Sequence, residues 1–336
     1  MKKIMAIICC LAFAVCGFAC GPGEGNGENG TEMIVDRQFR YGLTSQPSAE
    51  GYPGAYPISK NHKTVLEGVQ PIWTVAQWGD NFLIADGTAE EIEEGVFRFC
   101  APGKAENGGF DKTLISKYVE LDTNTGAFAL ELNTSMEYEE PRKQGDRWCH
   151  LLLSNGFLDN AAFGELTSFE ITLDMTLEKF EDHMGGAANP NLHAAQFILS
   201  FVIKSSNGKD SMYVNIPLFD NRYPTSGEKG SIDAGSNTNT GNFIYKAATA
   251  DFLDREEEIV IGEKRKVRAD LCALVRRAVA LAQENDKFTD TSYEDVTLGA
   301  FTIGYEIPGI YDMRFRVENF HMKADATRPL RTLDEE

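Results

Sequence analysis

The chain has 336 residues, 42% of them hydrophobic, which is enough apolar material to bury a core in one large domain or two modest ones. This composition excludes a disordered chain and a polytopic membrane protein. The formal net charge of -19 would repel a nucleic-acid backbone over most of the surface, so nucleic-acid binding is excluded as the main function. Neutral glycans and cations remain compatible with this charge.

The first 20 residues predict a secretory signal peptide. They begin with two lysines, continue with an apolar run from Ile4 to Val15, and end in small residues. Cys20, directly after Ala19, resembles the lipidated cysteine in the lipobox of bacterial lipoproteins, and this resemblance implies a lipid anchor. Gly17 stands where the lipobox usually has leucine, so ordinary signal-peptidase cleavage stays open. Residues 21–30 are rich in glycine and predict a flexible tether.

After the tether, residues 31–70 indicate an extended lead-in with few helix signals. From Pro71 onward, short runs of β-branched and aromatic residues alternate with turn residues, which is typical of strands. The predicted strands are 72–78, 95–101, 114–121, 126–133, 147–153, 166–180, 194–204, 211–219, 257–264, 296–306 and 310–322. This count predicts an all-β domain over residues 31–325, with a solvated tail at 326–336.

Two segments show the clearest periodicity. In 166–180, every second residue from Phe169 to Leu177 is apolar, as in a half-buried strand of an antiparallel sheet. In 267–285, apolar residues from Val267 to Leu281 recur at helical spacing, which predicts one amphipathic helix packed on the sheets.

Three cysteines remain outside the N-terminal segment: Cys100, Cys149 and Cys272. They allow at most one internal disulfide, and their spacing resembles no metal knuckle. We expect Cys149 and Cys272 to be small buried side chains, while a Cys100–Cys149 pair stays open.

Most enzyme signatures are absent from the sequence, including the zinc-protease, P-loop, Cys-x-x-Cys and serine-elbow motifs. None of the five histidines is spaced as a local metal pair, so we predict neither a metal nor a cofactor. Glu170, Asp174 and Glu178 line one face of a predicted strand, but neighbours four residues apart are separated by about 13 Å. Hydrolytic carboxylate pairs lie about 5 to 10 Å apart, so a solvated strand face is the favoured interpretation.

The segment RWCHLLL, residues 147–153, predicts a strand with two different faces. One face carries Arg147, Cys149 and two leucines, and the other carries Trp148 and His150 with Leu152. If the apolar rows of four such strands face one core, a second surface collects aromatic, amide, hydroxyl, carboxylate and imidazole groups. Its members are Trp148, His150, Leu152, Glu170, Thr172, Asp174, Gln196, Ile198, Ser200, Tyr213, Asn215 and Phe219. Sugars stack on aromatic rings and need polar partners, so this set suits a glycan groove; the alternative is a surface covered by the helix or a loop.

Loops supply further polar groups for this surface. One contributes Tyr138, Arg142 and Arg147, and another contributes Asp220, Arg222 and Tyr223; Asp220 and Arg222 also suit a local ion pair. A third loop has Asp233, Asn237 and Asn239 at the odd spacings of a calcium loop. It lacks the closing glutamate, so a flexible loop is favoured.

The C-terminal stretch 301–322 resembles the closing strands of secreted jelly-roll carbohydrate-binding modules. The residues that carry the pattern are Phe315, Val317, Asn319, Phe320 and Met322. This resemblance implies a jelly-roll or concanavalin-like β-sandwich. With the lipoprotein-like start, it implies a glycan-associated lipoprotein of a Gram-negative cell envelope, exported and anchored at the outer membrane or cell surface.

Three functions stay open. The first is binding of a polysaccharide or oligosaccharide through the surface that carries Trp148. The second is a polysaccharide lyase, with His150 or Tyr138 as the base and Arg142 or Arg147 neutralising a uronate. The third is a structural envelope protein in which Trp148 and His150 are covered.

Overall fold

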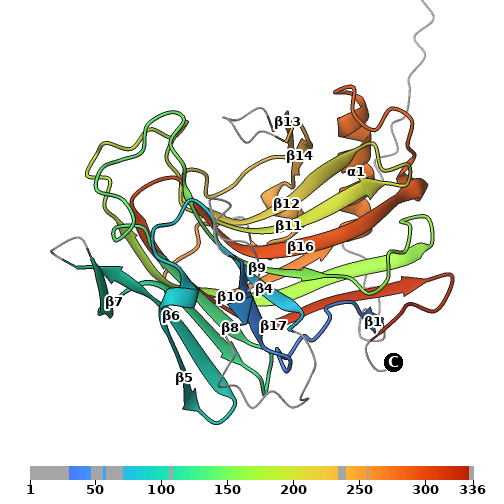
Figure 1. Cartoon of the computed structure of the whole chain (residues 1–336). Coiled ribbons are helices and arrows are strands. Elements are labelled where there is room, and N and C mark those ends of the chain that lie inside the picture. The colour runs from blue at the N-terminus through green and yellow to red at the C-terminus, as the bar shows by residue number, and fades with distance from the viewer. Residues whose placement is uncertain are drawn as a thin grey trace, which may run out of the picture.

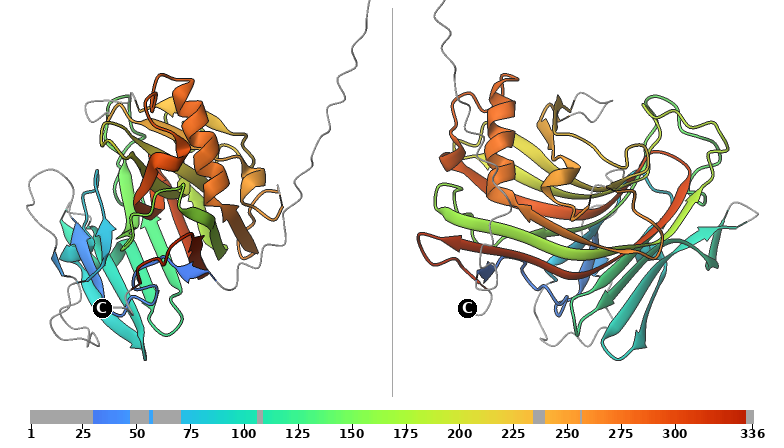
Figure 2. Two further views of the ribbon diagram at one scale, coloured as in Figure 1. Left: turned by 90° about the vertical axis from the view of Figure 1, so that its right-hand side faces the viewer. Right: turned by 180° about the vertical axis from the view of Figure 1, so that it is seen from behind.

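The computed structural model describes residues 30–46, 56–57, 71–105, 109–233, 240–255 and 257–332. The predicted signal peptide, Cys20 and most of the tether lie outside these residues. The strands form two sheets that pack face to face (Figures 1 and 2). The predicted jelly-roll or concanavalin-like β-sandwich with one accessory amphipathic helix is confirmed at this level.

Sheet A has the strand order β15-β10-β17-β8-β7-β6-β5, and β1 also pairs with β17. Its strands are β1 (Thr31–Glu32), β5 (Thr88–Glu93), β6 (Val96–Lys104), β7 (Phe110–Asp122), β8 (Phe128–Asn133), β10 (Leu166–Asp182), β15 (Lys264–Asp270) and β17 (Tyr311–Ala326).

Sheet B has the order β13-β14-β12-β11-β16-β9-β4-β2-β3. Its strands are β2 (Leu43–Gln46), β3 (Tyr56–Pro57), β4 (Trp73–Ala76), β9 (Cys149–Gly156), β11 (Gln196–Ser205), β12 (Ser211–Asp220), β13 (Lys229–Ile232), β14 (Phe243–Lys246) and β16 (Val296–Ile307). Three 3-10 turns join strands at η1 (Ile84–Asp86), η2 (Thr249–Asp251) and η3 (Tyr293–Asp295).

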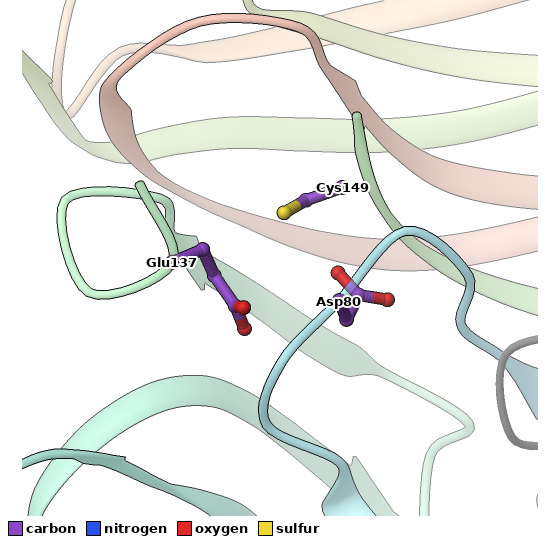
Figure 3. Close-up of side chains that lie close together, drawn as sticks. All are labelled: Asp80, Glu137 and Cys149. Carbon is purple, nitrogen blue, oxygen red and sulfur yellow. The ribbon is translucent and has the colours of Figure 1, made fainter. Parts of the chain in front are cut away.

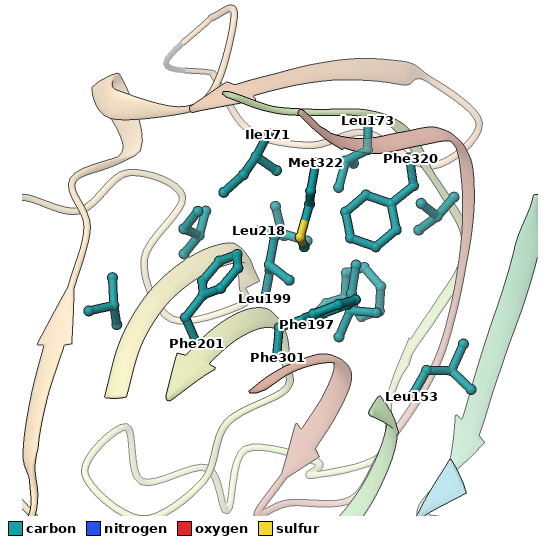
Figure 4. Close-up of a cluster of buried hydrophobic side chains, with 14 of the residues drawn as sticks. Leu153, Ile171, Leu173, Phe197, Leu199, Phe201, Leu218, Phe301, Phe320 and Met322 are labelled. Atoms are coloured by element: carbon teal, nitrogen blue, oxygen red, sulfur yellow. The ribbon is translucent and has the colours of Figure 1, made fainter. Parts of the chain in front are cut away.

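The core lies between the sheets, because each sheet turns one row of every second side chain inward. Figure 4 shows this layer, where Ile171 and Met322 of sheet A meet Leu199 and Phe301 of sheet B. Phe197 stacks on Phe315 with ring centroids 4.6 Å apart, which joins the two sheets directly. The cluster is continuous and also includes Met33, Phe39 and Leu43, so the described residues on both sides of Pro71 share one core.

The helix α1 (Leu271–Gln283) contacts strands of both sheets, among them β10 and β14 (Figure 2). Its buried row includes Leu274, Val275 and Ala278. It begins four residues later than the periodicity predicts, because Val267 belongs to β15, where Arg265, Val267 and Ala269 alternate with exposed residues. Asp270 ends that strand and caps the helix by accepting a hydrogen bond from the Ala273 N–H.

The predicted strand at 257–264 is wrong. Val260 and Ile261 are more than half exposed in a turn, and the strand begins only at Lys264. The buried guanidinium of Arg265 donates to the carbonyl oxygens of Arg255 and Glu257, which holds this apolar stretch as a loop.

The predicted tail is partly packed. Arg328 donates to both carboxylate oxygens of Asp159 at 2.8 Å, and Leu330 is only 5% exposed. Within the described ranges, no helix is long and apolar enough to cross a bilayer.

Candidate functional site

The face of sheet B that points away from the core carries the candidate site. We call it the polar face; its members are His150, Leu152 and Ser154 of β9, Thr302 and Glu306 of β16, Gln196, Ile198 and Ser200 of β11, and Tyr213 and Asn215 of β12. The residues between them, such as Leu151, Ile303 and Leu199, are fully buried in the core. The predicted two-faced character of residues 147–153 therefore holds from Cys149 onward, where β9 begins.

Strand register aligns four polar residues in one row across the polar face. His150 pairs with Glu306, Glu306 with Gln196, and Gln196 with Asp220. The Gln196 amide donates to Asp220 at 2.8 Å. Since neighbouring strands lie about 4.8 Å apart, this row spans about 14 Å from β9 to β12.

Aromatic rings stand at both ends of the row. At the β9 end, the Trp78 ring lies 4.6 Å from His150 and the Trp148 ring lies 5.6 Å from it, centroid to centroid. Trp78 is 39% exposed and Trp148 is half-buried. At the β12 end, Tyr223 is 48% exposed, and the Arg222 and Lys246 cations lie over its ring.

His150 is neutral at physiological pH. Burial lowers its pKa to about 4; the residue is only 5% exposed, and both indole rings lie beside its side chain. The Nδ1 atom faces the carbonyl oxygens of Trp78 and Trp148 at 3.1 and 3.0 Å, so Nδ1 carries the hydrogen. The free lone pair is on Nε2, which lies 3.9 Å from Glu306 Oε1.

The pKa values of the two carboxyl groups in the row are shifted in opposite directions. Desolvation raises the pKa of Glu306 to about 7, and the negative charge of Asp233 adds to this effect. Burial acts in the same direction at Asp220, but hydrogen bonds and charge from Arg222, with help from Lys246, lower the pKa of Asp220 overall. The row therefore holds one carboxyl group with a pKa near neutral pH and one with a lowered pKa, with Gln196 between them.

The predicted ligand-binding residue Arg142 is held by contacts within the protein. Arg142 donates to the carbonyl oxygens of Leu192 and Asp146, and its guanidinium lies 5.0 Å above the Trp148 ring. Arg142 is buried, whereas Arg147 is exposed just before β9. Arg142 thus packs on the indole; each of its two terminal nitrogens donates to a carbonyl oxygen, while its Nε has no hydrogen-bond partner among the described residues.

Tyr138 does not join the polar face. Its hydroxyl accepts from the Cys149 backbone N–H at 2.9 Å and donates to the Ile307 carbonyl, and the ring packs against the core. Burial raises its pKa well above the usual range. The structure therefore separates Tyr138 from His150, although both lie near the start of β9.

Two expectations about the polar face are wrong. Glu170, Thr172 and Asp174 lie on sheet A, because β10 pairs with β15 and β17; there Glu170 bonds Arg268 and Asp174 accepts from Asn319. Phe219 faces the core and contacts Phe315, because a bulge between β11 and β12 reverses the side-chain alternation before it reaches Phe219.

The expected set also includes buried members. His150, Leu152 and Ile198 are at most 5% exposed, and Ser200 is 8% exposed and donates to Asn215 Oδ1. Of the expected residues on the polar face, Gln196, Tyr213 and Asn215 are half-buried, as are Ser154, Thr302 and Glu306, which were not in the expected set. The polar face is therefore accessible mainly along its half-buried row and at its aromatic ends, and α1 does not contact β9 or β16 to any extent that would cover it.

Trp78 and Glu306 are the residues that sequence reasoning missed. Trp78 ends the predicted strand 72–78, and Glu306 is the last outward position of 296–306, so each had a strand position but no known neighbour. Their proximity to His150 depends on β4 and β16 flanking β9, which is long-range pairing that one sequence does not reveal.

The described cysteines form no disulfide, and the calcium-like loop is described only in part. Cys100, Cys149 and Cys272 are free thiols, with Cys149 fully buried and Cys272 packed against the core. Asp233 accepts from the backbone N–H and the hydroxyl of Thr240, while Asn237 and Asn239 lie outside the described residues.

Two clusters elsewhere have metal-ligand atoms within 4.8 Å of one another: Glu181 with His183 and Asp312, and Asp80 with Glu137 and Cys149 (Figure 3). In the first, Lys179 already lies 4.0 Å from Asp312. In the second, the Lys117 ammonium bonds Glu137, and burial raises the Cys149 pKa, which keeps the thiol protonated. A lysine cation thus already lies beside a carboxyl group of each set.

No known family model matches the chain, and no curated protein matches it in sequence. Among solved structures, the endoglucanase Cel12A from Rhodothermus marinus aligns with a TM-score of 0.38 and 12% identity, over 72% of this chain and 97% of that one. A family 12 xyloglucanase from Bacillus licheniformis aligns with a TM-score of 0.37 and 9% identity, over 71% and 97%. The xyloglucanase domain of NopAA from Sinorhizobium fredii, solved with cellobiose, gives 0.34 and 6%, over 71% and 96%. At these scores, the function proposed below depends on this chain's own residues.

Proposed function

We propose that this protein binds a polysaccharide or oligosaccharide along the polar face of sheet B. The observation that carries the proposal is the row His150–Glu306–Gln196–Asp220, which has exposed aromatic rings at both ends. Pyranose rings present C–H faces that stack on Trp78 and Tyr223, and their hydroxyls pair with amide and carboxyl groups between those rings.

The proposal is tested by isothermal titration of the purified protein with a panel of neutral polysaccharides. Trp78→Ala should weaken binding by about 1 to 3 kcal/mol, or about 5- to 150-fold in Kd, through lost stacking and burial. Leu114→Ala, a similarly exposed apolar residue on sheet A, should leave Kd unchanged. Absence of binding across the panel, or equal effects of the two variants, would refute it.

A second candidate function is glycoside cleavage by the same row. Its support is that the pKa of Glu306 is raised to about 7 while that of Asp220 is lowered, the pattern of an acid and a base in one site. Glu306 lies on β16 and Asp220 on β12, two strand positions apart, which corresponds to about 9 to 10 Å. This is close to the separation of the two carboxyl groups in inverting hydrolases. Glu306→Gln should then abolish the release of reducing ends and keep binding.

The lyase alternative places the base at His150. Its neutral state and free Nε2 suit a base, but the ring is 5% exposed and Tyr138 lies on the core side. Incubation with uronic-acid polymers would reveal the ultraviolet absorbance of an unsaturated product, and its absence would remove this alternative.

We further propose that the protein is exported and tethered to the cell envelope through a lipid on Cys20. The support is the sequence alone: a basic start, an apolar run, and a cysteine after small residues. Cys20→Ser should release the protein from the membrane fraction. A variant that fractionates with membranes as the wild type does would contradict the anchor.

A further inference from the structure

Lys117 is a charged residue in the inward row of sheet A. It shares this row with Val119 and Leu121 on β7, and its side chain is fully buried. Its ammonium bonds the carbonyl oxygen of Phe82 and the carboxylate of Glu137, and it lies 3.5 Å from Asp80 Oδ1. An unshared ammonium in this position would be very costly, so the two carboxyl groups are what stabilise it.

The two carboxyl groups differ in how they are held. Glu137 accepts the Asn81 N–H at 2.6 Å with its other oxygen, so it is fixed on both sides. Asp80 comes from the segment between β4 and η1; its side chain is fully buried, and among the described residues neither oxygen has a well-formed hydrogen bond. The Lys117 ammonium and the Cys149 thiol are its polar neighbours. Burial raises the pKa of Asp80 to about 7, with Lys117 opposing the shift and Glu137 adding to it.

From this geometry we infer that Lys117 and Asp80 condense into an isopeptide bond between β7 and the β4–η1 segment, with Glu137 as the proton acceptor. This modification is independent of the proposed glycan binding. Figure 3 shows Asp80 and Glu137 on facing segments, with Cys149 beside them.

The reaction needs no oxidant and no cofactor. Lys117 passes one proton to the Glu137 carboxylate along their hydrogen bond and becomes a neutral amine. The Nζ lone pair then attacks Cγ of the protonated Asp80 carboxyl, and a C–N bond forms. The C–O bond to the Asp80 hydroxyl breaks, and that hydroxyl leaves as water with a proton from the attacking nitrogen, relayed by Glu137.

Three physical conditions favour this condensation. The amine nitrogen lies 3.5 Å from Asp80 Oδ1, which places it beside the carboxyl carbon that it would attack, at a separation close to that of a near-attack arrangement. Both side chains are fully buried, so water has little access for the reverse hydrolysis. The amide also replaces a buried ammonium and a buried carboxyl group with a neutral group, which removes their desolvation cost.

The test is intact mass measurement of the whole chain under denaturing conditions. The wild type should weigh less than its sequence by one water molecule. Lys117→Met and Asp80→Ala should show no such loss after correction for the substitution, and N-terminal processing cancels in this comparison. Proteolysis should give a branched peptide that joins residues 80 and 117. Lys104→Met, which removes an exposed lysine paired with Glu139, should keep the loss of water.

Glu137→Gln tests the proton acceptor, because glutamine keeps the shape but cannot take the proton from Lys117; the fraction of chains that lose water should fall at least tenfold. A folded wild type with its full mass after prolonged incubation would overturn the inference, and this measurement holds even if every variant fails to fold. Loss of water that persists in Lys117→Met would overturn it equally.

Discussion

His150 is the residue whose ionisation the fold controls most clearly within the polar face. Two carbonyl oxygens fix its tautomer, and two indole rings lie beside it. Burial holds its pKa near 4, below the value of about 6.5 in an unfolded chain. The folded protein therefore binds fewer protons than the unfolded chain between these pH values.

This difference predicts a pH dependence of stability. The contribution of neutral His150 is fully present above about pH 6.5 and is lost as the pH falls toward 4, by at most about 3 kcal/mol. Glu306, with a raised pKa, acts in the opposite direction as the pH rises from about 4.5 to 7. The measurement is the free energy of unfolding against pH for the wild type and His150→Gln. Parallel curves for the two proteins would show that His150 does not titrate as described.

Individual residues also show where sequence reasoning stops. Cys149, Leu151 and Leu153 are all fully buried, as the alternation in RWCHLLL predicts. That alternation could not identify Trp78 or Glu306 as neighbours of His150, because the contact depends on which strands pair. Lys117 lies in the apolar row of a strand, and this position indicates a buried counter-charge. The sequence does not show that Asp80 and Glu137 supply it, because both are far from Lys117 in the chain.

At the scale of elements, strong periodicity predicted the long strands and failed on short or ambiguous ones. The segments at β10, β11, β12, β16 and β17 were all recognised, because each has a full apolar row. The apolar stretch around Val260 is instead a loop, and buried Arg265 donates to the carbonyl oxygens of Arg255 and Glu257 just before it. The bulge in β11–β12 also reversed the predicted face of Phe219, and a period-two pattern cannot show where such a bulge lies.

The pairing of β16 with β9 depends on a glycine at a close approach. Gly304 has φ +151°, and a Cβ there would lie 2.1 Å from the Leu151 carbonyl oxygen. Gly304→Ala should therefore cost about 3 kcal/mol or more in unfolding free energy, through backbone displacement and strain. Chemical denaturation is the measurement.

Gly299→Ala on the same strand is the matched control. Its new Cβ would come nearest to the flexible Lys204 side chain, at 2.9 Å, so this variant should lose much less stability. Equal losses would mean that the close approach to β9 is not what requires Gly304.

At the scale of the whole molecule, one core joins both sheets and α1, and the chain carries a formal net charge of -19. The two-layer architecture could be predicted, because many short alternating strands have few other ways to bury their apolar rows. The assignment of strands to sheets could not be predicted: β10 resembles the strands of the polar face in pattern and yet belongs to sheet A, where its outward carboxylates pair with arginines.

The net charge predicts a preference among glycans. Neutral polysaccharides should bind with a Kd that barely changes with ionic strength, whereas uronate polymers should bind more weakly at low salt because the protein repels them. Affinity measurements at 20 and 200 mM salt, about a threefold change in Debye length, would show the difference. Tighter binding of polyuronates at low salt would contradict this expectation and favour an anionic substrate.

The pairing of β1 with β17 has a mechanical consequence. Thr31 and Glu32 lie beside Ala324 and Lys323, the Met33 N–H donates to Met322, and the Glu32 carboxylate bonds His321. Tension applied to the chain before Gly30 would therefore act first on the short β1–β17 pairing and on β17. It would reach the polar face of sheet B only afterwards. The β1–β17 pairing would then break first under load, while the strands that align His150 with Asp220 keep their register.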